Sequence, residues 1–485
     1  MYYCNNVCDD LVAVMCVVGS LLASILAGIG LGFTSPTIDT MRNTVTTPDG
    51  TPLIVPDNSG LCVFEELSAS IFSASLTVGA LVGALMAGPL ADSIGRRLAL
   101  AINSPLGVAA YLSIGLSSNV YLLIAARFIA GLPVGIGPSV VSVYISEVAP
   151  TRLRGLLGAC NEMACVIGIT AAYAIGLIFR TDGGSTDPLV SSNTFCNWRL
   201  TSFVCIVPCL ALAIAMYFAL ESPRWLASRQ HMVEAQRILC KIRGCHTASD
   251  PRISSEMIDL TSSSDHGTRF VVRLRELLSC KKQLLIAITI QVLTQLSGLD
   301  VIAFYLVTIF QDAHLSYPDL MAVTVQLATA IAIIPACLLV ERSGRRPLLL
   351  LSSIGMCISL AIIGTYFFMD NAAFGWLSVV GAYGYNLFYA FGVGPIRWLL
   401  VAEIFPDSCR SIAAGIATMA SWLTLFIIIL SIDIITESTS RQAIFWFFSA
   451  VSAFITCFVW IGVPETKGKS FEDIRRLFYS TITHT

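Results

Sequence analysis

Apolar runs of membrane-spanning length recur along the whole chain and limit its fold more than any other feature. Many are near or above the roughly 20 residues that a helix needs to cross a bilayer. The runs begin near Leu11, Ser68, Leu98, Tyr121, Gly155, Thr201, Gln283, Pro318, Pro347, Phe374, Ser411 and Gln442. Of the 485 residues, 55% are hydrophobic and only 12% are charged, about half the charge of a typical soluble protein. Because backbone groups in lipid must be paired internally, the runs predict an all-α membrane protein with twelve transmembrane helices.

Short charged motifs repeat between the two halves of the chain. Two segments read E-x-x-P-x-x-x-R, one from Glu147 to Arg154 and one from Glu403 to Arg410. Two further pairs agree with this repeat: Gly95-Arg96-Arg97 with Gly344-Arg345-Arg346, and Glu221-Ser222 with Glu465-Thr466. Each motif follows a long apolar run. The repeat predicts two pseudo-symmetric six-helix bundles, an arrangement in which a solute binds between the halves.

The predicted boundaries divide the chain into four parts. Residues 1–220 and 283–463 form the two bundles, joined by a polar loop at 221–282 and followed by a tail at 464–485. Apolar residues in 224–243 have helical periodicity, which predicts short amphipathic helices on the membrane surface. A second basic helical piece is expected at 471–478.

The positions of Lys and Arg predict the orientation in the membrane. Outside the spans, only four basic residues lie in predicted outer loops: Arg42, Arg180, Arg199 and Arg441. The other loops and the tail carry the rest, so both termini are expected in the cytoplasm. We expect a multi-pass protein of the plasma membrane, with an internal membrane as the alternative.

No motif in the sequence points to a cofactor. There is no Cys/His cluster with metal-ligand spacing and no phosphate-binding Gly-x-x-x-x-Gly-Lys loop. We therefore expect no metal, no ATP, no nucleic-acid partner and no enzymatic chemistry. Cys62 and Cys196 lie in outer loops, where they are free thiols or, alternatively, a disulfide.

Taken in order, the motifs resemble those of the sugar porter branch of the major facilitator superfamily, which includes the facilitative glucose transporters. The residues that carry the resemblance are Gly95-Arg96-Arg97, Arg127, Glu147 with Arg154, 221–225 (ESPRW), 295–298 (QLSG), 341–346 (ERSGRR), 394–398 (GPIRW), Glu403 with Arg410, and 464–468 (PETKG). The resemblance implies the major facilitator fold, a sugar or polyol as solute, and transport by alternating access.

The resemblance also implies a role for the charged groups at the cytoplasmic ends of the spans. They are expected to form salt bridges that latch the halves closed on the inside. The group comprises Arg96, Arg97, Glu147, Arg154, Glu221, Arg224, Glu341, Arg345, Arg346, Glu403 and Arg410. Individual exposed pairs contribute roughly 0–1 kcal/mol, so several together bias an equilibrium and remain breakable. The alternative is that they are ordinary solvated helix ends.

Polar residues in the seventh span predict a substrate site. Gln291, Thr294 and Gln295 share one helix face, and Gly298 permits local unwinding. Polar groups in lipid are costly unless they face a cavity or a partner, and amides suit vicinal hydroxyls. Hydrogen bonding between helices is the alternative. The resemblance places a sugar-stacking tryptophan at Trp398, beside a break at Gly394-Pro395.

Several positions depart from the pattern of the glucose transporters. Substrate-binding amides of the family are replaced by Glu162, Thr294, Asp300, Thr329 and Ser421, while Gln295 is kept. Arg397 stands where the family often has proline. Three interpretations of Glu162, Asp300 and Arg397 remain open: they neutralise one another, they bind a charged or zwitterionic solute, or one carboxylate carries a coupling proton.

One further departure favours uncoupled transport. Thr34 stands where proton-coupled sugar porters carry an aspartate, so Arg127 needs another partner. We therefore predict facilitated diffusion of a hexose or related polyol. The alternatives are a proton-coupled symporter, a transporter of a charged solute, and a sugar sensor that does not transport. Against the sensor, the predicted cytoplasmic tail is only about 22 residues. Neither the particular sugar nor the oligomeric state follows from the sequence.

Overall fold

The computed structural model describes residues 11–42, 44–46, 52–54, 66–150, 153–179, 197–244, 253–254, 256–258, 277–313, 315, 317–369, 371–405 and 409–467. Within them, eleven helices are long and apolar enough to cross a membrane. The twelfth predicted span is formed by two shorter helices, α19 (Trp376–Phe391) and α20 (Val393–Ile404), which meet at Gly392. The described part therefore has the predicted twelve spans.

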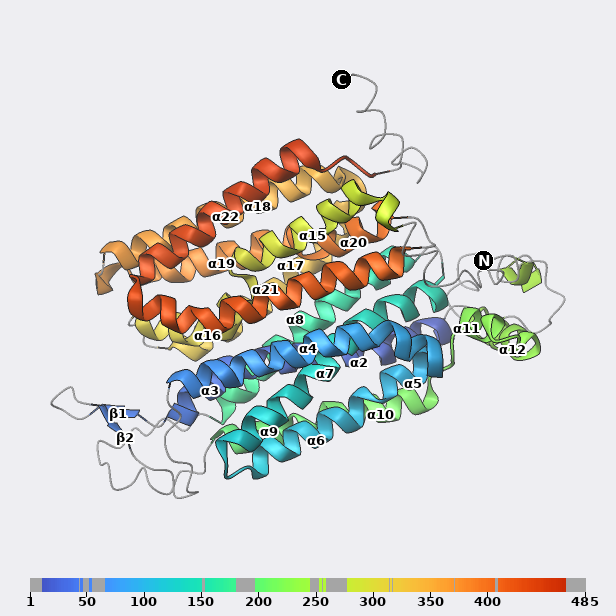
Figure 1. Cartoon of the computed structure of the whole chain (residues 1–485), viewed down its shortest axis with the longest axis horizontal. Helices are drawn as coiled ribbons and strands as arrows, with labels where there is room; N and C mark the ends of the chain where they lie inside the picture. The colour runs from blue at the N-terminus through green and yellow to red at the C-terminus, as the bar shows by residue number, and fades with distance from the viewer. Residues whose placement is uncertain are drawn as a thin grey trace, which may run out of the picture.

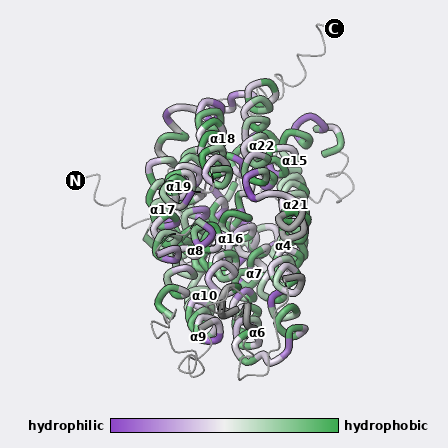
Figure 2. The backbone as a smooth tube through the Cα atoms, turned by 90° about the vertical axis from the view of Figure 1, so that its left-hand side faces the viewer, coloured by the Kyte–Doolittle hydropathy of each residue, from purple (hydrophilic) through white to green (hydrophobic). Residues whose placement is uncertain are grey.

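The helices form two bundles that lie side by side (Figure 1). The first bundle contains α2 (Leu11–Gly32), α3 (Thr34–Arg42), α4 (Glu66–Ile94), α5 (Arg96–Ala101), α6 (Asn103–Leu116), α7 (Val120–Val148), α8 (Arg154–Ile178), α9 (Asn197–Val204) and α10 (Ile206–Phe218). The second contains α15 (Lys281–Leu296), α16 (Leu299–Asp312), α17 (Pro318–Ser343), α18 (Arg345–Met369), α19, α20, α21 (Arg410–Ser438) and α22 (Arg441–Gly462), with a 3₁₀ turn at Ala372–Phe374. Figure 2 shows that most of this helical chain is hydrophobic.

Every predicted span begins within four residues of an observed helix start. The largest difference is in the sixth span, predicted from Thr201 and observed from Asn197. One element was not predicted: strands β1 (Thr44–Thr46) and β2 (Pro52–Ile54) pair antiparallel in the outer loop. The helical structure also extends past Gly32, because α3 continues the first span into residues that were predicted to be loop.

Two spans are broken where the sequence contains glycine. Gly298 has φ +85° and ψ +17°, a left-handed conformation that separates α15 from α16 and that other residues adopt at a cost. The break in the tenth span lies at Gly392, two residues before the predicted Gly394-Pro395. Pro395 is the third residue of α20, where its missing N–H would have had no partner within the helix.

Close backbone contacts hold the bundles together internally. A Cβ at Gly79 would lie 2.1 Å from the carbonyl oxygen of Phe128, and one at Gly131 would lie 2.2 Å from that of Leu76. Helices α4 and α7 therefore approach more closely than larger residues permit, as small residues allow in lipid. Between the bundles, α4 packs against α21 and α8 packs against α17 (Figure 1).

The central loop contributes α11 (Pro223–Ser228) and α12 (Met232–Ile242), which confirms the predicted short helices. Helix α12 is amphipathic, and buries Ala235, Leu239 and Ile242. Both helices lie at the same end of the molecule as α5 (Figure 1). The predicted helix at 471–478 and the two cysteines Cys62 and Cys196 lie outside the described residues.

Candidate functional site

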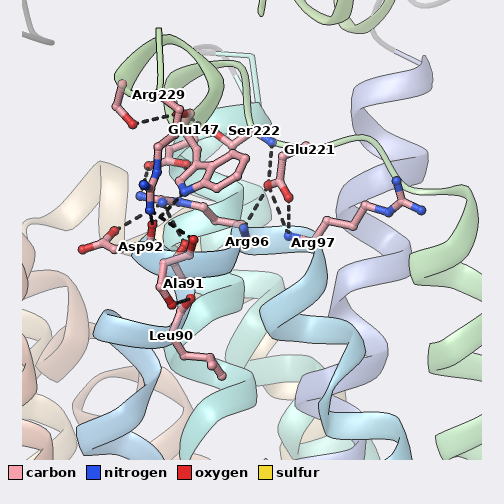
Figure 3. Close-up of polar contacts among 12 residues, drawn as sticks. Leu90, Ala91, Asp92, Arg96, Arg97, Glu147, Glu221, Ser222 and Arg229 are labelled. Carbon is pink, nitrogen blue, oxygen red and sulfur yellow. Dashed lines mark hydrogen bonds and ion pairs between the residues drawn. The ribbon is translucent and has the colours of Figure 1, made fainter. Parts of the chain in front are cut away.

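At the end of the first bundle where α4 is followed by α5, Arg96 joins three elements (Figure 3). Its Nε lies 3.0 Å from Oε2 of Glu147 and its Nη2 donates to Oε1 of the same carboxylate at 3.1 Å, which links α5 to α7. Its Nη1 lies 3.2 Å from Asp92 and donates to the carbonyl of Ala91 at 3.1 Å. The side chain of Arg96 is 12% exposed and that of Glu147 6%. The two ends of this contact are thus shielded from water and geometrically fixed.

Glu221 caps the start of α5 (Figure 3). Its Oε1 accepts from the backbone N–H groups of Arg96 at 2.9 Å and Arg97 at 3.2 Å, and its Oε2 also accepts from Arg97 at 3.2 Å. A carboxylate at a helix N-terminus satisfies otherwise unpaired donors and interacts favourably with the helix dipole. The side chain of Arg97 donates to the carbonyls of Met216 and Tyr217 at the end of α10. The loop after the sixth span is thereby tied to the start of the third.

The second bundle repeats this arrangement. Arg345 donates to Oε1 of Glu403 through Nε at 3.2 Å and Nη2 at 2.8 Å. Glu465 accepts from the backbone N–H groups of Arg345 and Arg346, each at 3.0 Å, and so caps α18. The hydroxyl of Thr466 donates to the second oxygen of Glu403. The repeated motifs of the sequence therefore build one structure twice.

A glycine in each bundle makes room for the capping carboxylate. Gly95 has φ +96° and Gly344 has φ +91°, both outside the range that residues with a Cβ prefer. A Cβ at Gly95 would lie 2.4 Å from Oε2 of Glu221, and one at Gly344 would lie 2.7 Å from Oε2 of Glu465. Glycine is needed here for both its conformation and its lack of a side chain.

The two caps differ in electrostatics. Burial raises the pKa of Glu221 above its ordinary value of 4.5, against the lowering effect of the backbone N–H groups of Ser222, Arg97 and Arg96. Burial also acts to raise the pKa of Glu465, but less, and hydrogen bonds from backbone N–H groups, that of Lys467 foremost, hold its pKa below 4.5. Desolvation therefore outweighs hydrogen bonding at Glu221, and hydrogen bonding outweighs desolvation at Glu465.

The ion pairs formed by Arg96 and Arg345 lie within one bundle each, with Glu147 and Glu403 respectively. Among the residues that the structure describes, no ion pair of this predicted group joins the two bundles. Arg224 is exposed. The side chains of Arg154, Glu341 and Arg410 lie outside the described part, so the predicted latch between the halves stays a prediction.

Gln295 lies at the centre of a second polar group, in the middle of the second bundle. Its Nε2 donates to Oδ2 of Asp300 at 2.9 Å and to Oγ of Ser421 at 3.0 Å. Gln295 is 3% exposed, and its Oε1 has no hydrogen-bond partner in the described structure. Three of the predicted substrate-site residues are therefore in contact, with one acceptor unused.

A third polar group crosses the boundary between the bundles. Tyr389 on α19 donates to Oε1 of Glu162 on α8 at 2.8 Å, and accepts from Nη2 of Arg397 on α20 at 3.2 Å. Arg397 and Glu162 are 4.0 Å apart and form an ion pair, with side chains 8% and 19% exposed. Nε and Nη1 of Arg397 are buried and have no hydrogen-bond partner among the described residues. The predicted guanidinium and one of the two predicted carboxylates are thus brought together across the boundary between the bundles.

Other predicted residues make local contacts. The hydroxyls of Thr294 and Thr329 donate to backbone carbonyls one helical turn earlier, at 2.7 and 2.8 Å. The guanidinium of Arg397 lies 4.9 Å from the ring centroid of Trp398, a cation–π contact. Trp398 is 36% exposed. Gln291 is fully buried, and neither atom of its amide has a described partner.

Arg127 is fully buried, and no carboxylate among the described residues forms an ion pair with it. Its Nη2 donates to the carbonyl of Gly30 at 2.9 Å and to the hydroxyl of Thr34. Its guanidinium lies 5.2 Å from the ring centroids of both Phe33 and Phe72. The partner that the sequence left unidentified is thus a set of neutral groups: a carbonyl, a hydroxyl and two aromatic faces.

Two hydrogen bonds join α16 of the second bundle to the first bundle. The backbone N–H of Val307 on α16 donates to the hydroxyl of Ser35 on α3 at 3.3 Å. The hydroxyl of Tyr173 on α8 donates to the carbonyl of Ala303 on α16. These contacts connect the seventh span to the first and fifth spans across the boundary between the bundles.

Sequence reasoning missed Tyr389 and Asn161. Asn161 accepts from Ser24 and donates to the carbonyl of Pro138 at 3.1 Å, which joins α8 to α2 and α7. An asparagine beside Glu162 within an apolar span is a signal that was available. Tyr389 gives no such signal, because tyrosine is common in spans and its role depends on a helix from the other bundle.

A groove of about 670 Å³ between α4, α7 and α21 is unrelated to these polar groups. It is lined almost entirely by apolar side chains, among them Ile71, Phe128 and Phe426, and it is wide open. Sugar sites need convergent polar groups, which this groove lacks.

Two bundles that meet at a polar centre, with repeated charge clusters at one end, define a solute transporter of the two-bundle membrane class. Comparison with known proteins agrees: residues 13–478 match the family model described as "Sugar (and other) transporter". The chain belongs to this sugar transporter family. Both the predicted family and the predicted function class, sugar transport, are confirmed.

Curated relatives match over nearly the whole chain. "Sugar transporter ERD6-like 6" of Arabidopsis thaliana is 32% identical over 97% of this chain and 91% of its own length. Facilitated glucose transporter member 8 of Bos taurus is 30% identical over 93% and 91%. Facilitated trehalose transporter Tret1 of Apis mellifera ligustica is 30% identical over 96% and 88%.

Solved structures share the fold. The proton:xylose symporter XylE bound to 6-bromo-6-deoxy-D-glucose matches with a TM-score of 0.77 at 23% identity, covering 97% of this chain and 99% of that one. The inward open conformation of XylE from E. coli matches with a TM-score of 0.76 at 24% identity, covering 95% and 98%. At these identities the likeness shows the fold, which confirms the predicted major facilitator architecture.

Proposed function

We propose that this protein carries a hexose or a related polyol across a membrane by facilitated diffusion. The solute would bind between the bundles, where Gln295 and Trp398 hold it and Glu162, Thr294, Asp300, Thr329 and Ser421 adjust the fit. Unused hydrogen-bonding atoms support this assignment, because Gln295 Oε1 and Arg397 Nε and Nη1 suit a solute rich in hydroxyls. The plasma membrane is the proposed location, with both termini in the cytoplasm.

The observation that carries the uncoupled mechanism is the environment of Arg127. Its hydrogen-bond partners Thr34 and Gly30 contribute neutral oxygens, so among the described residues no carboxylate pairs with Arg127 to carry a coupling proton. Relatives named as facilitated glucose and trehalose transporters are consistent with this mechanism.

Proton-coupled symport is the second candidate, and a specific observation favours it. Glu162 and Asp300 are two carboxylates near one guanidinium, and either is placed to carry a proton between the bundles. A matching structure is that of a proton:xylose symporter.

Counterflow of labelled glucose in proteoliposomes distinguishes the candidates. Equal uptake with and without an inward proton gradient supports the facilitator. Accumulation that requires the gradient supports the symporter and assigns the proton to Glu162 or Asp300. Absence of uptake by folded protein in both conditions contradicts a glucose transporter of either kind.

The cytoplasmic charge clusters would act as the gate. Each ties the inner ends of three helices of one bundle through a charge-assisted hydrogen bond network, so each bundle would move as a rigid unit. Contacts between the outer ends, such as Ser35 with Val307, would open and close in the opposite phase.

A further inference from the structure

Between the two bundles, acidic side chains outnumber basic ones. Glu162 and Asp300 contribute two carboxylates, and Arg397 is the cation that interacts electrostatically with both of them. The other ionisable side chains that interact electrostatically with these three are Cys165 on α8 and the tyrosines Tyr385 and Tyr389 on α19. With the acids and the arginine charged and the rest neutral, one negative charge is uncompensated.

The geometry assigns the uncompensated charge to Asp300. Arg397 forms its ion pair with Glu162, and Tyr389 bonds to both partners. Asp300 accepts from the neutral amide of Gln295, and it forms no ion pair within 4.0 Å among the described residues. Arg397 acts on Asp300 only at longer range.

The second carboxylate oxygen of Asp300, Oδ1, accepts no hydrogen bond from the described residues. Asp300 is only partly buried. The neighbouring Gln295 has a buried acceptor, Oε1, that also lacks a hydrogen-bond partner among the described residues. A carboxylate oxygen without a partner binds a group with several N–H donors and a positive charge better than a hydroxyl.

We propose that the site prefers sugars carrying a protonated amine, with Asp300 as the residue that determines this preference. The proposal rests on the proposed function, since it concerns the same site. Neutral hexoses bind through the same hydroxyl contacts and lack the ionic one. A hydrogen bond to a charged group predicts a preference of about tenfold over the matching hydroxyl sugar.

The test uses the full-length protein in proteoliposomes and competition against uptake of labelled glucose. The competitors are glucose and its derivatives with an amine in place of the hydroxyl at C2, C3 or C6, because the structure does not fix the position. We expect at least one amine to compete about tenfold better than glucose. Asp300→Asn should reduce the ratio of the two inhibition constants to near one, whatever it does to uptake itself.

Asp312→Asn is the matched control. Asp312 is on the same helix, is paired with Arg441 at 3.2 Å near the outer end, and lies outside the site. This variant should keep the amine preference of the unchanged protein.

Other outcomes overturn the proposal. If glucose is taken up but no amine competes better than glucose, the site carries no net negative charge that binds an amine. The proposed function then stands without the inference. A preference that survives Asp300→Asn assigns the charge to another residue. Hexose accumulation driven by a proton gradient, without amine preference, would mean that a proton neutralises the site. No uptake of any labelled sugar contradicts both this inference and the proposed function.

Discussion

The hydroxyl of Tyr389 lies 2.8 Å from Oε1 of Glu162, across the boundary between the two bundles. The same hydroxyl accepts from Arg397, so one tyrosine holds a carboxylate of the first bundle and a guanidinium of the second in fixed positions. Since alternating access requires the bundles to move relative to each other, this bridge is placed where a bound solute and the bundle movement affect one another.

Tyr389→Phe should weaken transport without unfolding the protein. The change removes one hydroxyl that hydrogen-bonds to two charged groups, a loss that corresponds to roughly tenfold in binding. We expect apparent sugar affinity in proteoliposome uptake to fall by about that factor. Tyr383→Phe is the control, because Tyr383 is on the same helix and packs against the apolar core. Equal kinetics for both variants would contradict a positioning role for Tyr389.

Gly95→Ala and Gly344→Ala should each destabilise the folded protein. Both glycines combine a positive φ with an extended ψ, a region essentially confined to glycine, where an alanine costs about 1–3 kcal/mol in the backbone alone. Its Cβ would also lie 2.4 Å or 2.7 Å from the carboxylate that caps the next helix. The thermal unfolding midpoint in detergent should fall by several degrees for both variants.

Gly88→Ala provides the control for these two substitutions. No atom lies within 4 Å of a Cβ at Gly88, and alanine favours a helix over glycine. Its midpoint should stay the same or rise slightly. A similar loss in all three variants would mean that the strained turns at Gly95 and Gly344 carry no particular stability.

The fold could be predicted almost entirely from the sequence, because lipid leaves a chain few options. Long apolar runs determine where the spans lie. Glycines determine where a span is interrupted, as Gly298 does between α15 and α16. The break at Gly392 was predicted two residues too late, at Gly394-Pro395. The prediction placed it beside Pro395, but a proline also fits the first turn of a helix, which is where Pro395 lies.

The site could be predicted only in part. Gln295, Asp300 and Ser421 were identified by resemblance, and they do lie in contact. Which charge pairs with which could not be derived, because Glu162 and Arg397 are 235 residues apart and their pairing depends on how α8 and α20 pack. The same reason explains why Tyr389 was missed. Helical periodicity predicts which face of its own helix a residue lies on, but it does not predict which residues of other helices contact it.

The two capping carboxylates should respond oppositely to pH. The pKa of Glu465 is lowered, so its stabilisation is present above 4.5 and is lost as the pH falls through its folded-state pKa. Burial raises the pKa of Glu221, so its contribution is fully present below 4.5 and is lost as the pH rises through its folded-state pKa. At neutral pH, Glu465→Gln should therefore destabilise more than Glu221→Gln. Thermal unfolding of both variants between pH 4 and pH 7 should show the difference between their unfolding midpoints shrinking as the pH falls. A difference that does not change with pH would contradict the directions of the two pKa shifts.

Glu403→Gln should loosen the inner end of the second bundle. The carboxylate accepts twice from Arg345 and once from Thr466, and an amide keeps only one acceptor oxygen. We expect Cys409, which is fully buried near this end, to react faster with a thiol reagent. Peptide mass spectrometry would measure the rate, with the exposed Cys457 as reference in the same sample. An unchanged ratio of the two rates would contradict a gating role for the cluster.

Thr34→Asp should add a partner to Arg127 and make transport sensitive to pH. Arg127 is already buried, and its Nε and Nη1 have no hydrogen-bond partner, so the cost of desolvating the guanidinium is incurred with or without the new carboxylate. The hydroxyl of Thr34 already contacts Nη2, which places the substituted side chain within reach. Thr34→Asn has the same shape without the charge. We expect the aspartate variant to unfold at the same or a higher temperature than the asparagine variant. Its sugar uptake, measured between about pH 5 and pH 8, should change with pH, because carboxylates within a membrane span can relay protons. Uptake that is equally independent of pH in both variants would show that a carboxylate beside Arg127 is not enough to couple protons to transport.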